Sequence, residues 1–110
     1  MARNKIFCFL SWNVRGLNNR AKCCIVRSFI RSSKVSVVCL QETKLSSISL
    51  DKFQSFCGFY LQEFRTLDAT GTRGGLLTAW NNFLFDCIEH WAGSYTLNTL
   101  FQRKADKKLF

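Results

Sequence analysis

At 110 residues the chain is long enough for one small domain, or for one part of a larger one. Its hydrophobic content of 47% excludes an intrinsically disordered chain, and no apolar stretch approaches the length of a transmembrane helix. Sixteen Lys and Arg against seven Asp and Glu leave a net charge of +9. This surplus favours a polyanionic partner, either nucleic acid or an acidic membrane surface. The alternative is a soluble protein that is basic without such a partner.

The first residues, MARNKIFCFLSW, place basic side chains ahead of a short apolar stretch, as a signal peptide does. No small-residue cleavage site follows, and Asn13 and Arg15 interrupt the apolar stretch. The sequence therefore predicts an intracellular protein, nuclear or cytoplasmic, and not a secreted one.

The first 40 residues carry the pattern of a strand, a helix and a second strand. Residues 5–12 (KIFCFLSW) are nearly all apolar, which suits a central strand covered on both faces. Residues 18–33 follow as a helix that Asn18 or Asn19 can cap, and residues 35–40 (VSVVCL) form a second short strand. The segment predicts a βαβ unit with parallel strands. The apolar side of the helix is expected at Ala21, Cys24, Ile25, Ser28 and Phe29. Its basic residues lie mostly elsewhere around the helix: Arg20, Lys22, Arg27 and Arg31.

The rest of the chain favours strands. Residues 48–57 can form a short helix, and residues 68–75 (DATGTRGG) have the composition of a loop. Four further segments are typical of strands: residues 58–64, 74–80, 85–91 and 95–101. Their spacing predicts an antiparallel meander after the βαβ unit, and therefore an α/β fold.

The six cysteines show no C-x-x-C pair, and the single histidine, His90, has no partner at zinc-finger spacing. Several cysteines lie in apolar runs or on the predicted apolar side of the helix. We therefore expect small core hydrophobes in a reducing compartment, with no cysteine-bound metal and no disulfide-linked partner. The cysteines are Cys8, Cys23, Cys24, Cys39, Cys57 and Cys87.

The two parallel strands end in polar residues. Asn13 ends the first strand, and Gln41 and Glu42 end the second, so all three are expected at one edge of the sheet. Open α/β sheets bind ligands at this carboxyl edge. Glu42 is the candidate ligand for Mg²⁺, which uses one or two carboxylates together with waters and phosphate oxygens. The alternative is a surface glutamate that begins a loop.

Other polar residues could assist at this edge. Asn13 can bind a phosphate or orient a catalytic group, but asparagine also ends strands and forms turns. Arg15 and Lys44 follow the two candidate residues and can contact phosphates, although exposed basic residues usually only face solvent. Arg73 precedes two glycines that can equally serve a tight turn into the next strand. His90 lies within a predicted strand and is interpreted as structural.

The motifs SWNVRGLNN, VCLQETK and TRGGLLTAWN, in this order, resemble the beginning of the endonuclease/exonuclease/phosphatase superfamily. The resemblance is to the endonuclease domain of plant non-LTR (LINE-type) retrotransposons in particular, and it extends over residues 6–101. It implies a four-layered α/β sandwich that cleaves phosphate esters with Mg²⁺ or Mn²⁺. It also implies that Asn13 is the first active-site asparagine, that Glu42 binds the metal, and that the partner is DNA rather than a membrane.

Family domains are longer than this chain, and their later motifs do not occur in it: the tyrosine strand, Asp-x-Asn and the terminal Ser-Asp-His. The resemblance therefore implies that residues 1–110 are the N-terminal part of a DNA-nicking endonuclease domain, inactive alone. Three alternatives remain open: a non-enzymatic basic nucleic-acid-binding module, a vestigial chain, and another superfamily member such as an abasic-site nuclease or a phosphatase. The sequence does not indicate an oligomeric state.

Overall fold

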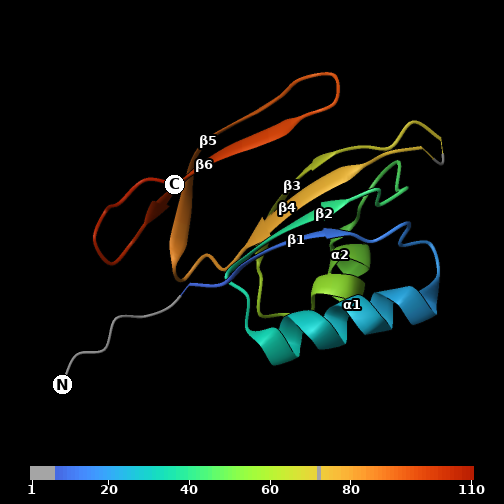
Figure 1. Cartoon of the computed structure of the whole chain (residues 1–110), viewed down its shortest axis with the longest axis horizontal. Coiled ribbons are helices and arrows are strands. Elements are labelled where there is room, and N and C mark those ends of the chain that lie inside the picture. Colours follow the sequence, from blue (N-terminus) through green and yellow to red (C-terminus); the bar gives the residue numbers. More distant parts are fainter. Residues whose placement is uncertain (1–6, 72) are drawn as a thin grey trace.

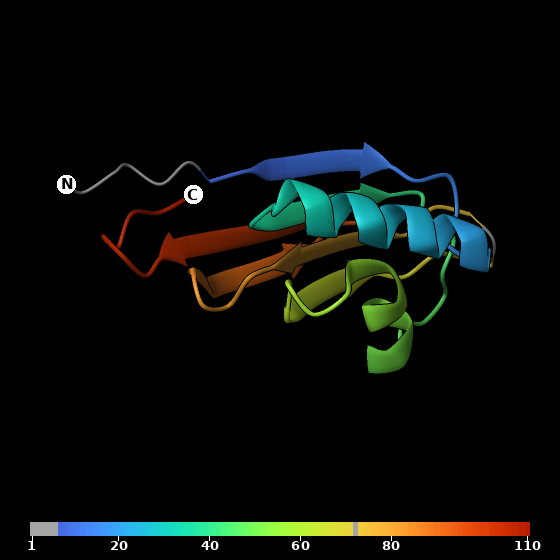
Figure 2. The same ribbon diagram turned by 90° about the horizontal axis from the view of Figure 1, so that it is seen from below.

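The computed structural model describes residues 7–71 and 73–110, so Lys5 and Ile6 of the first predicted strand lie outside the described residues. Two helices cover one face of a four-stranded sheet, and a hairpin of two longer strands lies over its other face (Figure 1). Figure 2 shows the same layers from the helix side. The elements are β1 (Phe9–Asn13), α1 (Arg20–Ser33), β2 (Val37–Gln41), α2 (Leu50–Cys57), β3 (Glu63–Leu67), β4 (Leu76–Trp80), β5 (Phe85–Ala92) and β6 (Leu97–Arg103). The predicted α/β class is confirmed.

The four-stranded sheet has the order β1-β2-β4-β3. β1 and β2 are parallel, with Asn13 opposite Gln41, which confirms the predicted βαβ unit. β4 is antiparallel to both of its neighbours, β2 and β3. Among the strands of the described residues, β5 and β6 pair with each other and not with the four-stranded sheet, so the antiparallel strands are divided between two sheets instead of forming one meander. No helix among the described residues is long and apolar enough to cross a membrane.

Helix α1 begins where the sequence predicts but buries a different face. Asn19 is the N-cap, and its side-chain oxygen accepts hydrogen bonds from the Ala21 and Lys22 amides. The buried residues are Cys23, Val26 and Ile30. The expected face was wrong, since Ala21, Cys24, Ile25, Ser28 and Phe29 are all exposed. The helix has apolar residues on two sides, and packing against the sheet and α2 selects one of them.

The sheet separates two hydrophobic clusters. The larger lies between the sheet and the helices, where Leu40 and Leu77 of the sheet meet Phe53 and Phe56 of α2. The smaller lies under the hairpin, where Val37 and Trp80 of the sheet pack against Phe85 and Phe101, with Phe7, Leu84 and Cys87 at its margin. Side chains alternate along each strand, so neighbouring residues belong to different clusters.

The bounds of the strand predicted over residues 58–64 were wrong, because β3 spans Glu63–Leu67 and begins later in the chain. Gly58 has φ +64° and ends α2 in a conformation that other residues rarely adopt. The turn that follows is held by Gln62, whose side-chain amide donates to the carbonyl oxygens of Phe59 and Tyr60 at 2.8 Å each. These bonds from a side chain to the backbone hold a turn where the first part of the strand was expected.

The cysteines divide by burial. Cys23 and Cys57 are buried and Cys87 is partly buried, but Cys8, Cys24 and Cys39 are exposed, so the expectation of core cysteines was wrong for these three. All six thiols are free. Burial raises the pKa of the Cys57 thiol far above its usual value, which keeps it in its unreactive neutral form.

Candidate active site

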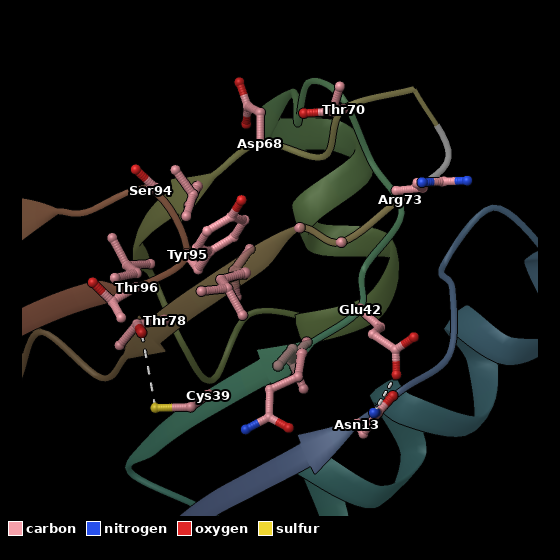
Figure 3. Close-up of a pocket in the computed structure, with 18 of the residues that line it drawn as sticks. Asn13, Cys39, Glu42, Asp68, Thr70, Arg73, Thr78, Ser94, Tyr95 and Thr96 are labelled. Carbon is pink, nitrogen blue, oxygen red and sulfur yellow. Dashed lines mark hydrogen bonds between the residues drawn. The ribbon is translucent and has the colours of Figure 1, made fainter.

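Asn13 and Glu42 lie side by side at the carboxyl edge of the parallel strands. Asn13 is the last residue of β1, and Glu42 directly follows β2. The Asn13 side-chain amide donates a hydrogen bond to Glu42 Oε2 although the two residues are 29 positions apart. Figure 3 shows both side chains pointing toward each other. The predicted juxtaposition of an amide and a carboxylate is therefore observed.

The orientation of the Asn13 amide is fixed from its other end. Its oxygen accepts a hydrogen bond from the Arg15 backbone N–H at 3.2 Å, which forms a local turn. The oxygen is thus engaged by the chain itself, and the NH₂ group is directed at Glu42. In this arrangement Asn13 orients the carboxylate, while Glu42 Oε1 has no protein partner among the described residues.

Three loops at this edge are joined by backbone hydrogen bonds. Residues 14–17 bond to residues 41–43, through Val14 N to Gln41 O at 3.0 Å and Gly16 N to Glu42 O at 2.7 Å. Residues 43–44 bond in turn to Gly74 and Gly75, through Thr43 N to Gly75 O at 3.1 Å and Lys44 N to Gly74 O at 2.8 Å. The three motifs of the sequence therefore form one platform that is joined by backbone hydrogen bonds.

Gly75 is required by this platform. Its φ is +94°, and a Cβ built on it would collide with Thr43 Oγ1 and lie 3.2 Å from the Lys44 amide nitrogen. Thr43 is 1% exposed and has no room to withdraw. The second glycine of the R-G-G motif thus serves close packing of two loops, whereas the sequence predicted either a tight turn into the next strand or a phosphate contact.

The backbone around Glu42 is strained. Arg15, Glu42 and Lys44 have φ values of +54°, +53° and +58°, in the left-handed region. For residues other than glycine this region costs about 1–2 kcal/mol each. Such strain persists where surrounding structure holds it, and it is concentrated at functional sites.

A groove of about 970 Å³ opens beside Glu42, between the sheet and the tip of the β5–β6 hairpin. Its floor includes Cys39 and Thr78 of the sheet, and Tyr95 at the hairpin tip leans over it (Figure 3). The hairpin residues that line the groove were not predicted from the sequence: Ser94, Tyr95, Thr96, Leu97 and Asn98. The turn composition of residues 92–94 was the available signal, but it did not indicate where the hairpin would lie.

The other predicted residues surround this edge. Arg15 is exposed, Lys44 is half-buried with its stem near Gly16, and Arg73 is exposed and lines the groove. His90 lies in β5, does not line the groove, and accepts a hydrogen bond from Arg65 Nε at 3.4 Å. The three basic residues outnumber the two carboxylates of this edge and its groove, Glu42 and Asp68, so the net charge here is positive, as an anion-binding site requires.

The donor set fits a hard divalent cation that keeps part of its hydration. Glu42 presents an exposed carboxylate with one oxygen unused by the protein, and Mg²⁺ can be held by one carboxylate plus waters and substrate phosphate oxygens. Among the described residues, no three His, Cys, Asp or Glu side chains form a complete cage. Glu42 is the residue that would hold the ion.

Fold and edge together define a layered α/β protein with a polar site where two parallel strands end. Residues 10–106 match the model of the Endonuclease/Exonuclease/phosphatase family, and the chain belongs to this family. Among solved structures, the chain is similar to the AP endonuclease LMAP from Leishmania major, with a TM-score of 0.62 and 24% identity. That similarity covers 94% of this chain and 38% of the other, and it is one of fold. A search of the curated proteins found no match.

Proposed function

We propose that this chain supplies the metal-binding edge of a DNA-nicking endonuclease of the retrotransposon type. The observation that carries the proposal is the Asn13–Glu42 pair, which lines the groove. The pair is held by loops that have a strained backbone and are joined by hydrogen bonds. Membership of the Endonuclease/Exonuclease/phosphatase family supports phosphate-ester hydrolysis, and the net charge of +9 supports a DNA substrate. The retrotransposon type rests on the order of the three sequence motifs.

The proposed roles follow from the geometry. Glu42 holds Mg²⁺ or Mn²⁺, which when bound would neutralise charge on the phosphate and stabilise the leaving oxygen. Asn13 orients the Glu42 carboxylate through its fixed amide. The side chains of Arg15, Lys44 and Arg73 attract the DNA backbone to this edge and contact its phosphates.

We further propose that these residues do not suffice for hydrolysis by themselves. Metal-assisted hydrolysis needs a base, an acid and a charge stabiliser within hydrogen-bonding reach of the phosphate, and the Asn13–Glu42 pair supplies only one carboxylate and one amide. The chain spans 38% of the length of its structural neighbour, which supports a contribution from further residues. Six free thiols support a reducing intracellular setting.

The test is nicking of supercoiled plasmid in Mg²⁺. The 110-residue chain alone is expected to be inactive, and the chain followed by the rest of a family domain is expected to nick. In that longer protein, Glu42→Gln should lower the rate by about 100-fold, because the metal loses its carboxylate. Glu89→Gln, an exposed carboxylate on β5, is the matched control and should leave the rate unchanged. Full activity of Glu42→Gln would contradict the assignment, and nicking by the chain alone would contradict its insufficiency.

A further inference from the structure

The charge of the chain is distributed unevenly along the sequence. All seven acidic residues lie at or after Glu42, whereas eight of the sixteen basic residues lie before it. The first 41 residues therefore carry +8 of the net charge of +9, without one carboxylate side chain to balance it. Helix α1 lies wholly within this segment.

Three arginines form a stripe along α1. Arg20, Arg27 and Arg31 are separated by seven and four residues, which places them on one face of the helix. All three are exposed, and the stripe is about 16 Å long at ~1.5 Å per residue. Within residues 7–71 and 73–110, no hydrogen bond or ion pair engages their guanidinium groups. Lys22 lies on another face, where its Nζ donates to Val14 O at 2.9 Å.

A second, smaller hollow lies at the far end of this stripe. It has a volume of about 260 Å³ and is lined by Arg27, Arg31, Cys57, Gly58, Phe59 and Tyr60. Phe59 is 70% exposed and Tyr60 is 37% exposed, so both rings are accessible beside the two guanidinium groups. Neither these unpaired guanidinium groups nor these exposed aromatic rings belong to the hydrophobic core.

The backbone of the turn that presents the two rings is held by hydrogen bonds from side chains. Tyr60 O accepts hydrogen bonds from the side chains of Gln62 and Asn81, at 2.8 and 2.9 Å, and Asn81 is 6% exposed. The positive φ of Gly58 directs the chain out of α2, and Arg27 packs against it, 3.6 Å from the position of a Cβ. The backbone that carries the aromatic pair is therefore held next to the arginines before any ligand binds, which lowers the entropic cost of binding.

We propose that the stripe Arg20–Arg27–Arg31 and the Phe59–Tyr60 turn form a binding surface for single-stranded nucleic acid. Guanidinium groups pair with successive phosphates, and aromatic rings stack on bases that are free of a complementary strand. A duplex hides its base faces and would use only the arginines. The stripe begins at the first residue of α1, close to the carboxyl edge, so a strand bound along it leads toward the Asn13–Glu42 pair.

The proposal stands apart from the proposed catalysis, because it uses none of the residues of the Asn13–Glu42 site. The experiment is fluorescence anisotropy with the 110-residue chain and a labelled 20-nucleotide oligothymidine, between about 50 and 300 mM NaCl. Arg27→Gln with Arg31→Gln should weaken binding and make the slope of log K against log salt shallower by about 1.4, since two phosphate contacts are lost. Phe59→Ala should weaken binding about tenfold with the slope unchanged, and Phe59→Trp should retain it.

The matched control removes two charges elsewhere. Lys104 and Lys107 lie in the exposed turn after β6, and their replacement by Gln should leave the slope nearly unchanged. The proposal is overturned if this control pair changes the slope as much as the arginine pair, or if a 20-base-pair duplex competes as well as the single strand. Stronger binding to phosphatidylserine vesicles than to the oligonucleotide, or no binding at about 50 mM NaCl, would also overturn it.

Discussion

The two faces of the four-stranded sheet differ in how completely other elements cover them. The face toward α1 and α2 is closed by a continuous core, whereas the other face is packed under the hairpin at one end and open as a groove at the other. Neighbouring residues show the contrast: Leu40 is 1% exposed in the helix-side core, and Cys39 is exposed in the groove. Because side chains alternate along a strand, one short sequence can stabilise the fold and line the site at once.

The contrast predicts that substitutions on the helix side act mainly on folding. Phe56 is fully buried and meets Phe53 edge-on, with ring centroids 6.0 Å apart. Phe56→Ala should lower the free energy of unfolding by about 3–5 kcal/mol, from lost burial and the cavity left behind. Urea denaturation followed by circular dichroism measures this. Phe83→Ala, at a side chain that is 77% exposed, should change it by less than about 0.5 kcal/mol, and equal effects would contradict the contrast.

The next largest effect is expected where the site and the fold meet. Gly75→Ala adds a Cβ that collides with Thr43 Oγ1 in a backbone of φ +94°. We expect a loss of about 2–3 kcal/mol in the free energy of unfolding, with faster amide hydrogen exchange at Thr43 and Lys44. Gly74→Ala is the control: it has φ +72° but no atom within 4 Å of the added Cβ, so it should cost less. Equal costs would show that the close approach is unimportant.

A smaller effect on stability is expected from the strained backbone of Glu42, and it can be measured separately from the loss of the carboxylate. Glu42→Gly and Glu42→Ala both remove the carboxylate and its bond to Asn13, but only glycine accepts φ +53° without strain. The glycine variant should be more stable than the alanine variant by about 1 kcal/mol, measured by urea denaturation. Equal stabilities would contradict the backbone strain assigned to this position.

The smallest effect is expected from the ion pair between Arg103 and Asp106, where β6 ends. The hydrogen bond from Arg103 lowers the pKa of the Asp106 carboxyl to about 2. A carboxyl whose pKa is lower in the folded than in the unfolded state stabilises the protein above its unfolded pKa, and this stabilisation is lost as the pH falls through the folded value. Asp106→Asn should therefore lower the urea midpoint slightly at pH 5, and the difference from wild type should shrink as the pH falls toward 2 and vanish below it. A difference that stays constant between pH 5 and pH 2 would indicate another role for Asp106.

The sequence predicted the parts that depend on local pattern and chain topology. The apolar runs located β1 and β2, and their polar ends, Asn13 and Gln41, lie opposite each other as a parallel pair requires. The N-cap of α1 was predicted to be Asn18 or Asn19, and Asn19 fills this position. These features need no knowledge of the rest of the fold.

What the sequence did not predict depends on long-range packing. The buried face of α1 depends on its packing against α2 and the sheet. The start of β3 depends on the turn that the Gln62 side chain holds by hydrogen bonds. The groove exists because the hairpin packs against one end of the sheet, through Trp80, Phe85 and Phe101. These contacts join residues from different elements, so no pattern within a single segment signals them.

The central claim, that Glu42 at the carboxyl edge holds a divalent cation, is tested most directly by paramagnetic broadening. Mn²⁺ would be titrated into ¹⁵N-labelled chain while the backbone amide signals are recorded. We predict selective broadening of residues 13–16, 41–44 and 74–75, abolished by Glu42→Gln and retained in Glu89→Gln. Broadening that is centred elsewhere, or that is unchanged in Glu42→Gln, would contradict the account.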